Sequence, residues 1–212
     1  MYKHLICFFS YKRPELTEKS FLNLLENIRP TDQLLVIDQQ MENYDLYTKH
    51  KDRIDYLFFL KMNYEIGPAW MLIKKTTEWI KDKAKSFGHK GDKIWIPEII
   101  DIVESDTIGN KGWIDRVEKL IDLPKVGIAS GFYEKGIRQL LEPVDENGIM
   151  YSETANGVNM MFKLDYFLDL FDVLGGKGQD WAVSKLNLKR GNIVALRDEI
   201  EHIGEHIRRG TY

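Results

Sequence analysis

The sequence HLICFFSYKRPELTEKSFLNLLENIRPTDQLLVID, residues 4–38, contains the pattern that decides the fold. Residues 4–10 are a short apolar run rich in aromatic side chains, which is typical of a buried strand. Pro14 stands where a helix can begin, because the first helical turn needs no N–H from that position. Apolar residues then recur at helical spacing over 15–28, and residues 34–38 form a second apolar run that ends in Asp38. The stretch therefore predicts a strand, a helix and a second strand.

The same alternation continues along the chain. Further strands are predicted over 54–60, 94–103, 126–130 and 156–162, and further helices over 67–86, 112–123, 165–171 and 179–189. The segment 201–212 is polar. Strands that alternate with helices are typical of a parallel sheet with right-handed crossovers. We therefore predict a single α/β domain, 1–212, with a mostly parallel central sheet flanked by helices.

Composition and charge argue against several classes of protein. The length of 212 residues suits one domain, and no apolar stretch reaches the roughly 20 residues that a membrane-spanning helix needs. A net charge of −3 gives no general attraction to nucleic acid or to anionic lipid. The single cysteine, Cys7, lies in the first apolar run, where we expect a buried thiol and no disulfide. Residues 1–4 lead into that run without a signal-peptide pattern, so we expect a soluble cytoplasmic protein.

Polar residues follow the ends of the predicted strands. In an open parallel sheet, ligands bind at the carboxyl ends of the strands. A hydroxyl, carboxylates and an amide occur there, within 10–15, at Asp38, within 63–67 and within 104–106. Glu104 and Asp106 are two residues apart, so in an extended segment their carboxylates point to the same side. We expect a nucleotide site at this edge of the sheet.

In order and spacing these segments resemble the GT-A glycosyltransferases, in particular their large inverting family 2-like group. The motifs that carry the resemblance are, in chain order, Ser10-Tyr11-Lys12-Arg13-Pro14-Glu15, Asp38, Asn63-Tyr64-Glu65-Ile66-Gly67, Glu104-Ser105-Asp106 with Trp113, the apolar strand 156–162, Gln179-Asp180-Trp181, and Glu201-His202-Ile203-Gly204. The chain departs from the family pattern at Glu104, which replaces an Asp, and at Gln179, which replaces an acid. It also has Trp70 and Lys74 where the family more often has Arg and Asn. The resemblance implies a GT-A-like fold and inverting transfer of a sugar from a nucleoside-diphosphate sugar, with a UDP-sugar favoured, to a hydroxyl acceptor such as a carbohydrate.

The resemblance also implies roles for individual residues. The donor would contact Ser10, Tyr11, Arg13, Glu15, Asp38, Asn63, Gly67, Glu104 and Ser105, in a nucleotide-binding half over 1–107. A divalent metal, Mn²⁺ or Mg²⁺, would bind Asp106 and His202, with His206 as the competitor of His202. Asp180 would be the base that takes the acceptor proton, and Gly157 and Trp181 would contact the acceptor in the half 108–212.

Two other functions fit the same residues. A sugar nucleotidyltransferase shares the architecture, but it normally has a glycine-rich, arginine-containing loop after the first strand, and residues 10–15 contain no glycine. A module that binds a nucleotide or a glycan without turnover is the second alternative, which the altered Glu104 and Gln179 favour. The chain leaves little room for an acceptor region, so a partner or a homo-oligomer is expected to complete it.

Overall fold

The strand-helix-strand unit at the N-terminus forms the first half of a large sheet. The computed structural model describes residues 2–61, 66–86, 96–133, 140–142, 144–174 and 180–204. Strands β1 (His4–Tyr11), β2 (Gln33–Gln39), β3 (Tyr56–Leu60) and β4 (Ile99–Glu104) run parallel in the order β3-β2-β1-β4. Cys7 is fully buried on β1. The predicted α/β class and the parallel arrangement of these strands are confirmed.

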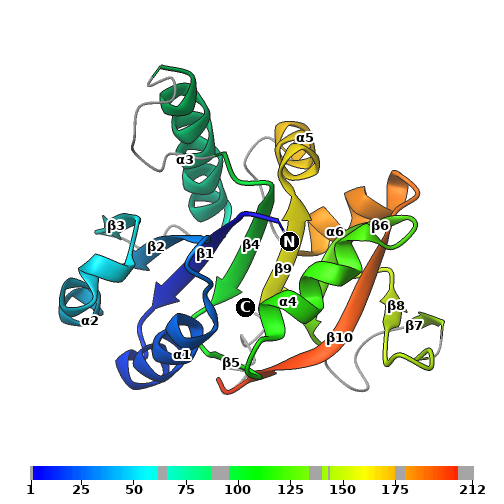
Figure 1. Cartoon of the computed structure of the whole chain (residues 1–212), viewed down its shortest axis with the longest axis horizontal. Coiled ribbons are helices and arrows are strands. Elements are labelled where there is room, and N and C mark those ends of the chain that lie inside the picture. Colours follow the sequence, from blue (N-terminus) through cyan, green and yellow to red (C-terminus); the bar gives the residue numbers. More distant parts are fainter. Residues whose placement is uncertain are drawn as a thin grey trace, which may run out of the picture.

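The sheet continues into the second half of the chain, where strand directions are mixed. Its remaining strands are β5 (Thr107–Gly109), β6 (Val126–Phe132), β7 (Leu140–Glu142), β8 (Met150–Ser152), β9 (Asn159–Lys163) and β10 (Ile193–His202). Strand β9 runs antiparallel to both β4 and β6 and lies between them, whereas β10 runs parallel to β6 and antiparallel to β5 and β8. One ten-stranded sheet therefore joins the two halves (Figure 1).

Helices cover both faces of this sheet (Figure 1). On one face, α1 (Pro14–Asn27), α2 (Tyr44–Lys49) and α4 (Trp113–Glu118) contribute core side chains, and on the other face α3 (Ile66–Ser86), α5 (Leu164–Leu174) and α6 (Asp180–Lys189) do so. Short 3₁₀ turns lie at Lys51–Arg53 and Lys119–Asp122. Side chains of β1 alternate between the two faces, with Leu5 and Cys7 on one and Ile6 and Phe8 on the other. No helix in the described ranges is both long and apolar enough to cross a lipid bilayer.

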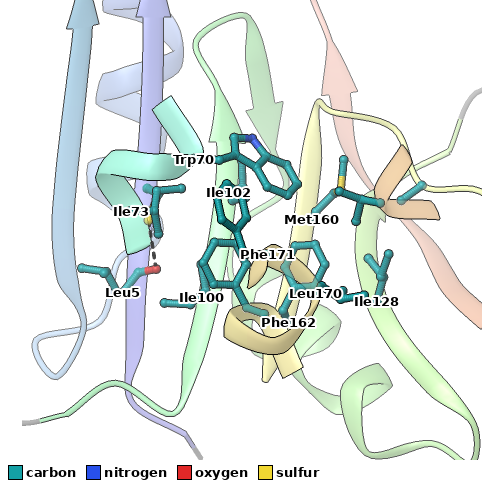
Figure 2. Packing of buried hydrophobic residues seen from close by; sticks show 14 of the residues in the cluster. Leu5, Trp70, Ile73, Ile100, Ile102, Ile128, Met160, Phe162, Leu170 and Phe171 are labelled. Atoms are coloured by element: carbon teal, nitrogen blue, oxygen red, sulfur yellow. Dashed lines mark hydrogen bonds between the residues drawn. The ribbon is translucent and has the colours of Figure 1, made fainter. Parts of the chain in front are cut away.

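Trp70 projects from α3 into the core, where it packs against α5 and the sheet (Figure 2). The centre of its ring system is 5.8 Å from that of Phe171 on α5 and 6.2 Å from that of Phe162 on β9. Offset and edge-on aromatic pairs of this kind contribute roughly 0.5–1.5 kcal/mol each beyond the burial of their area. These contacts hold α3 and α5 against the central strands whose ends carry the candidate site.

Several predicted elements have different bounds in the structure, and three of these differences have a clear physical cause. The strand predicted over 94–103 begins at Ile99, because Pro97 has no N–H to donate to the ladder. The strand predicted over 156–162 begins at Asn159, after a turn in which Asn156 Oδ1 accepts a hydrogen bond from the backbone N–H of Val158. The helix predicted over 112–123 begins at Trp113, since Gly112 has a left-handed φ of 75°, and it tightens into a 3₁₀ turn after Glu118.

Strand β10 was not predicted, because the charged run Arg197-Asp198-Glu199 interrupts its apolar pattern. The pairing of β10 with β6 shifts register between Leu196 and Ile200, so the charged run forms a bulge. Arg116 of α4 donates to Glu199 at 2.7 Å, which neutralises the buried carboxylate. The first two residues of the predicted polar segment, 201 and 202, are the last two residues of β10. Residues 205–212 and Gln179 lie outside the described residues.

Candidate active site

Three potential metal ligands meet at the carboxyl end of β4. Glu104 is the last residue of β4, Asp106 lies in the turn that leads to β5, and His202 ends β10. One ligand atom from each residue lies within 4.8 Å of the other two. All three residues were predicted from the sequence to lie in the site, Asp106 and His202 as metal ligands and Glu104 as a donor contact.

The pairing of β5 with β10 brings His202 to this place. His202 lies opposite Thr107 in the antiparallel ladder, and the backbone N–H of Ile203 donates to the carbonyl of Asp106 at 2.8 Å. Figure 1 shows β5 and the end of β10 lying side by side. The imidazole therefore meets a carboxylate that is almost 100 residues away in the sequence, and His202 Nε2 lies 3.1 Å from Asp106 Oδ2.

The charges at this cluster are strongly coupled. Burial, together with the negative charges of Asp106 and Asp180, raises the pKa of Glu104 to about 7, although His202 and Arg13 act in the opposite direction. The hydrogen bond to Asp106 raises the pKa of His202. Burial disfavours ionisation of Asp106, but the hydrogen bond from His202 and the charges of His202 and Arg13 lower its pKa. Carboxylates crowded in this way favour the binding of a cation.

The carboxylate of Asp106 fits a metal ligand. Asp106 is 9% exposed, and its Oδ1 atom is buried without a hydrogen-bond partner among the described residues. A buried oxygen without a partner is costly unless a ligand or an ion satisfies it. Two carboxylates and an imidazole are a donor set that a divalent transition metal accepts.

Arg13 reaches the same carboxylate from the loop after β1. Its Nη1 atom donates to Asp106 Oδ2 at 2.7 Å. Tyr11, at the end of β1, is partly buried, and Glu15 is exposed in the first turn of α1. Ser105 is partly buried in the turn between Glu104 and Asp106. These predicted donor contacts therefore lie in or next to the loops that border the metal cluster.

Ser10 and Asp38 lie below the surface of that edge. Asp38 is fully buried; its Oδ1 accepts hydrogen bonds from Ser10 Oγ at 2.8 Å and Asn43 Nδ2 at 3.0 Å, and its Oδ2 accepts one from the backbone N–H of Asn43 at 3.0 Å. Gln40 and Met41, in the loop that this network supports, both have left-handed backbone φ angles, of 72° and 59°. In this conformation Asp38 supports the loop and presents no exposed oxygen to a base. Gly67 is the second residue of α3, and Asn63 and His206 lie outside the described residues.

Asp180 and Gly157 lie beside Glu104. The backbone N–H of Gly157 donates to Asp180 Oδ2 at 3.2 Å, and Asp180 begins α6. A Cβ atom on Gly157 would lie 3.1 Å from Glu104 Oε1 and 3.7 Å from Asp180 Oδ2. Both carboxylates therefore lie close to the space that a side chain at position 157 would fill. Trp181, the next residue of α6, is 58% exposed.

One supporting contact was not predicted. Asn159 on β9 donates from Nδ2 to Asp101 Oδ1 at 2.8 Å and to the carbonyl of Ile102 at 3.0 Å, and its Oδ1 accepts from the N–H of Gly131 at 2.8 Å. Asn159 thereby ties β9 to β4 on one side and to β6 on the other. Asp101 is a charged residue within the apolar run of β4, and this contact gives its carboxyl group a hydrogen-bond partner. Its partner is almost 60 residues away, so no local pattern marks the pair.

The whole chain matches solved structures in fold. The mannosyltransferase PcManGT from Pyrobaculum calidifontis, solved in complex with GDP-Man and Mn²⁺, superposes with a TM-score of 0.61 over 96% of this chain, at 15% sequence identity. The chain has a GT-A-like fold. TarS from S. aureus, residues 1–349, matches with a TM-score of 0.53 over 92% of this chain, at 11% identity. The chain spans 58% of the length of each of these two structures.

No family model matches the sequence, and no curated protein is detectably similar to it. At these identities the structural similarity establishes the fold, and the predicted GT-A-like architecture is confirmed. The activity has to be argued from the side chains at the edge of the sheet.

Proposed function

We propose that this protein is a metal-dependent glycosyltransferase, which moves a sugar from a nucleoside-diphosphate sugar to a hydroxyl group of an acceptor. The observation that carries the proposal is the cluster of Glu104, Asp106 and His202 at the carboxyl edge of a sheet with a GT-A-like fold. A solved structure of similar fold is a mannosyltransferase in complex with GDP-Man and Mn²⁺, which supports this reading.

Glu104, Asp106 and His202 would hold the metal ion. Magnesium prefers an all-oxygen set of ligands, whereas manganese also accepts an imidazole, so the presence of His202 favours Mn²⁺. The bound ion would neutralise charge that develops on the diphosphate leaving group. Arg13 would add a planar, permanently charged donor on the side of the site formed by the loop after β1.

The donor would lie across the loops that follow β1 and β2. Tyr11 would stack on the base. Asp38 would either hold the base-binding loop in shape through its hydrogen bonds with Asn43, or give up those bonds and accept a hydrogen bond from the base instead. The family resemblance favours a UDP-sugar. Because a structure of similar fold was solved with GDP-Man, a GDP-sugar is the first alternative.

Asp180 is our choice for the catalytic base. Its carboxylate lies at the N-terminus of α6, and the N–H of Gly157 orients Oδ2. The acceptor oxygen would form a bond to the anomeric carbon while the bond from that carbon to the diphosphate oxygen breaks, and Asp180 would take the hydroxyl proton. Attack from the face opposite the leaving group gives inversion. Exposed Trp181 would stack against a sugar ring of the acceptor.

A panel of UDP- and GDP-sugars tests the proposal, with donor hydrolysis and transfer measured with and without Mn²⁺. We expect turnover of at least one donor only with the metal, and loss of that turnover in Asp106→Ala. A nucleotide that binds equally well without metal, and no turnover of any donor, would favour the alternative of a binding module. Release of pyrophosphate from a sugar phosphate and a nucleoside triphosphate would favour a nucleotidyltransferase.

A further inference from the structure

The carboxylate of Asp106 already holds a cation of the chain itself. Arg13 Nη1 donates to Asp106 Oδ2 at 2.7 Å, and His202 Nε2 lies 3.1 Å from the same oxygen. The side chain of Asp106 is only 12% exposed, whereas that of Arg13 is 34% exposed. A guanidinium therefore lies beside one of the atoms that the proposed metal would use, and part of it faces solvent.

The backbone directs Arg13 into this position. Lys12 and Arg13 have left-handed φ angles of 56° and 53°, and Arg13 precedes Pro14 at the start of α1. Each such non-glycine residue is strained, and strain of this kind persists only where other contacts impose it. Thr17 provides two contacts, because its N–H donates to the carbonyl of Arg13 at 2.9 Å and its hydroxyl donates to the carbonyl of Lys12 at 3.2 Å.

The ion pair is packed closely against the backbone at the end of the described chain. A Cβ atom on Gly204 would lie 2.2 Å from Asp106 Oδ2 and 2.7 Å from Arg13 Nη1. Only a glycine leaves room for the pair at this position. The arrangement is therefore built into the fold by Gly204 on one side and the strained turn on the other.

We infer that Arg13 is an exchangeable cation. It pairs with Asp106 in the absence of metal, and it moves to the diphosphate of the donor when the metal takes the carboxylate. This inference rests on the proposed function. The physical reason is charge balance, since Asp106 has one negative charge to share between the metal and the guanidinium, whichever of its two oxygens each one contacts. The negatively charged phosphates of the donor offer Arg13 a stronger partner.

The exchange couples the two ligands. Metal binding alone would have to break the ion pair between Arg13 and Asp106, so the free protein would bind Mn²⁺ weakly. A nucleoside diphosphate would pair with the released guanidinium, so each ligand would strengthen binding of the other to the same degree.

The test uses Arg13→Gln, with Lys19→Gln as the matched control, because Lys19 is an exposed cation on the adjoining helix α1. Mn²⁺ affinity of the protein without nucleotide is measured by electron paramagnetic resonance, and UDP and GDP affinity in saturating Mn²⁺ by calorimetry. Loss of a charge-assisted, partly exposed ion pair should change each affinity by about fivefold to tenfold. Arg13→Gln should bind Mn²⁺ more tightly than the wild type and the nucleotide more weakly, whereas Lys19→Gln should change neither.

Circular dichroism confirms folding of the variants, and Arg13→Lys, which retains a charge but not the planar fork, replaces Arg13→Gln if the latter does not fold. If the wild type binds Mn²⁺ but the Arg13 variant binds it with unchanged or lower affinity, the exchange is wrong and the proposed function stands. Unchanged nucleotide affinity of the variant would refute the transfer to the diphosphate. If no variant binds Mn²⁺, the proposed metal-dependent function fails together with the inference.

Discussion

The buried carboxyl group of Asp101 makes the stability of the fold depend on pH. Asp101 is fully buried on β4, and burial raises its pKa from 3.8 to about 8 even though the hydrogen bond from Asn159 acts in the opposite direction. The folded chain therefore holds this proton at pH values where the unfolded chain has released it. Stability from this group is complete below pH 3.8 and is lost as the pH rises towards 8.

The size of the effect follows from the shift. Each unit of pKa difference corresponds to about 1.36 kcal/mol, so the free energy of unfolding should decrease by on the order of 5 kcal/mol at most between pH 4 and pH 8. Asp101→Asn keeps a side-chain oxygen that accepts from Asn159 and removes the titration. We expect the variant to be more stable than the wild type by about 2 kcal/mol at pH 5 and by on the order of 5 kcal/mol at pH 8.

Urea unfolding at pH 5, 6, 7 and 8 measures this difference, with Asp45→Asn on the exposed surface of α2 as the matched control. The control should keep the pH dependence of the wild type. An Asp101→Asn variant that is less stable than the wild type at pH 8, or that keeps the same slope with pH, would show that Asp101 is ionised in the fold and that our assignment of its proton is wrong.

Three further predictions concern the active site. Asp180→Asn should lower kcat for transfer by about 100-fold to 10,000-fold while UDP or GDP binding in Mn²⁺ stays unchanged, and an undiminished kcat would remove Asp180 as the base. Gly157→Ala should retain the fold but lower kcat, because the added methyl group would lie only 3.1 Å from Glu104 Oε1 and would displace that atom. Steady-state kinetics measures kcat and a thermal melt checks the fold; an unchanged kcat would show that the position of Glu104 is not critical. Trp181→Ala should raise KM for a carbohydrate acceptor and leave KM for the donor unchanged, so an effect on the donor alone would contradict stacking of the acceptor on this ring.

Local patterns in the sequence predicted the first half of the fold well. The apolar runs of β1 and β2, the helical spacing of α1 and the long helix α3 are each encoded within a single segment. The closeness of Glu104 and Asp106 could likewise be predicted, because both residues lie at the end of one predicted strand. Pro97 explains the late start of β4, so the sequence itself marks this strand boundary.

The remaining features depend on contacts between distant segments. His202 meets Asp106 only because β10 pairs with β5, and β10 has a charged bulge that conceals its strand pattern. The resemblance to a family pointed to His202, whereas periodicity alone could not. The tie from Asn159 to Asp101 and the close packing of Gly204 against Asp106 have no local signature at all. Their partners become neighbours only when the sheet is complete.

Anomalous diffraction from a crystal grown with Mn²⁺ and a nucleoside diphosphate tests the central claim most directly. The account predicts one strong manganese peak within coordination distance of carboxylate oxygens of Glu104 and Asp106 and of a ring nitrogen of His202, with the diphosphate on its open side. A crystal that contains the nucleotide but has no manganese at this cluster, or has it bound by other residues, would contradict the account.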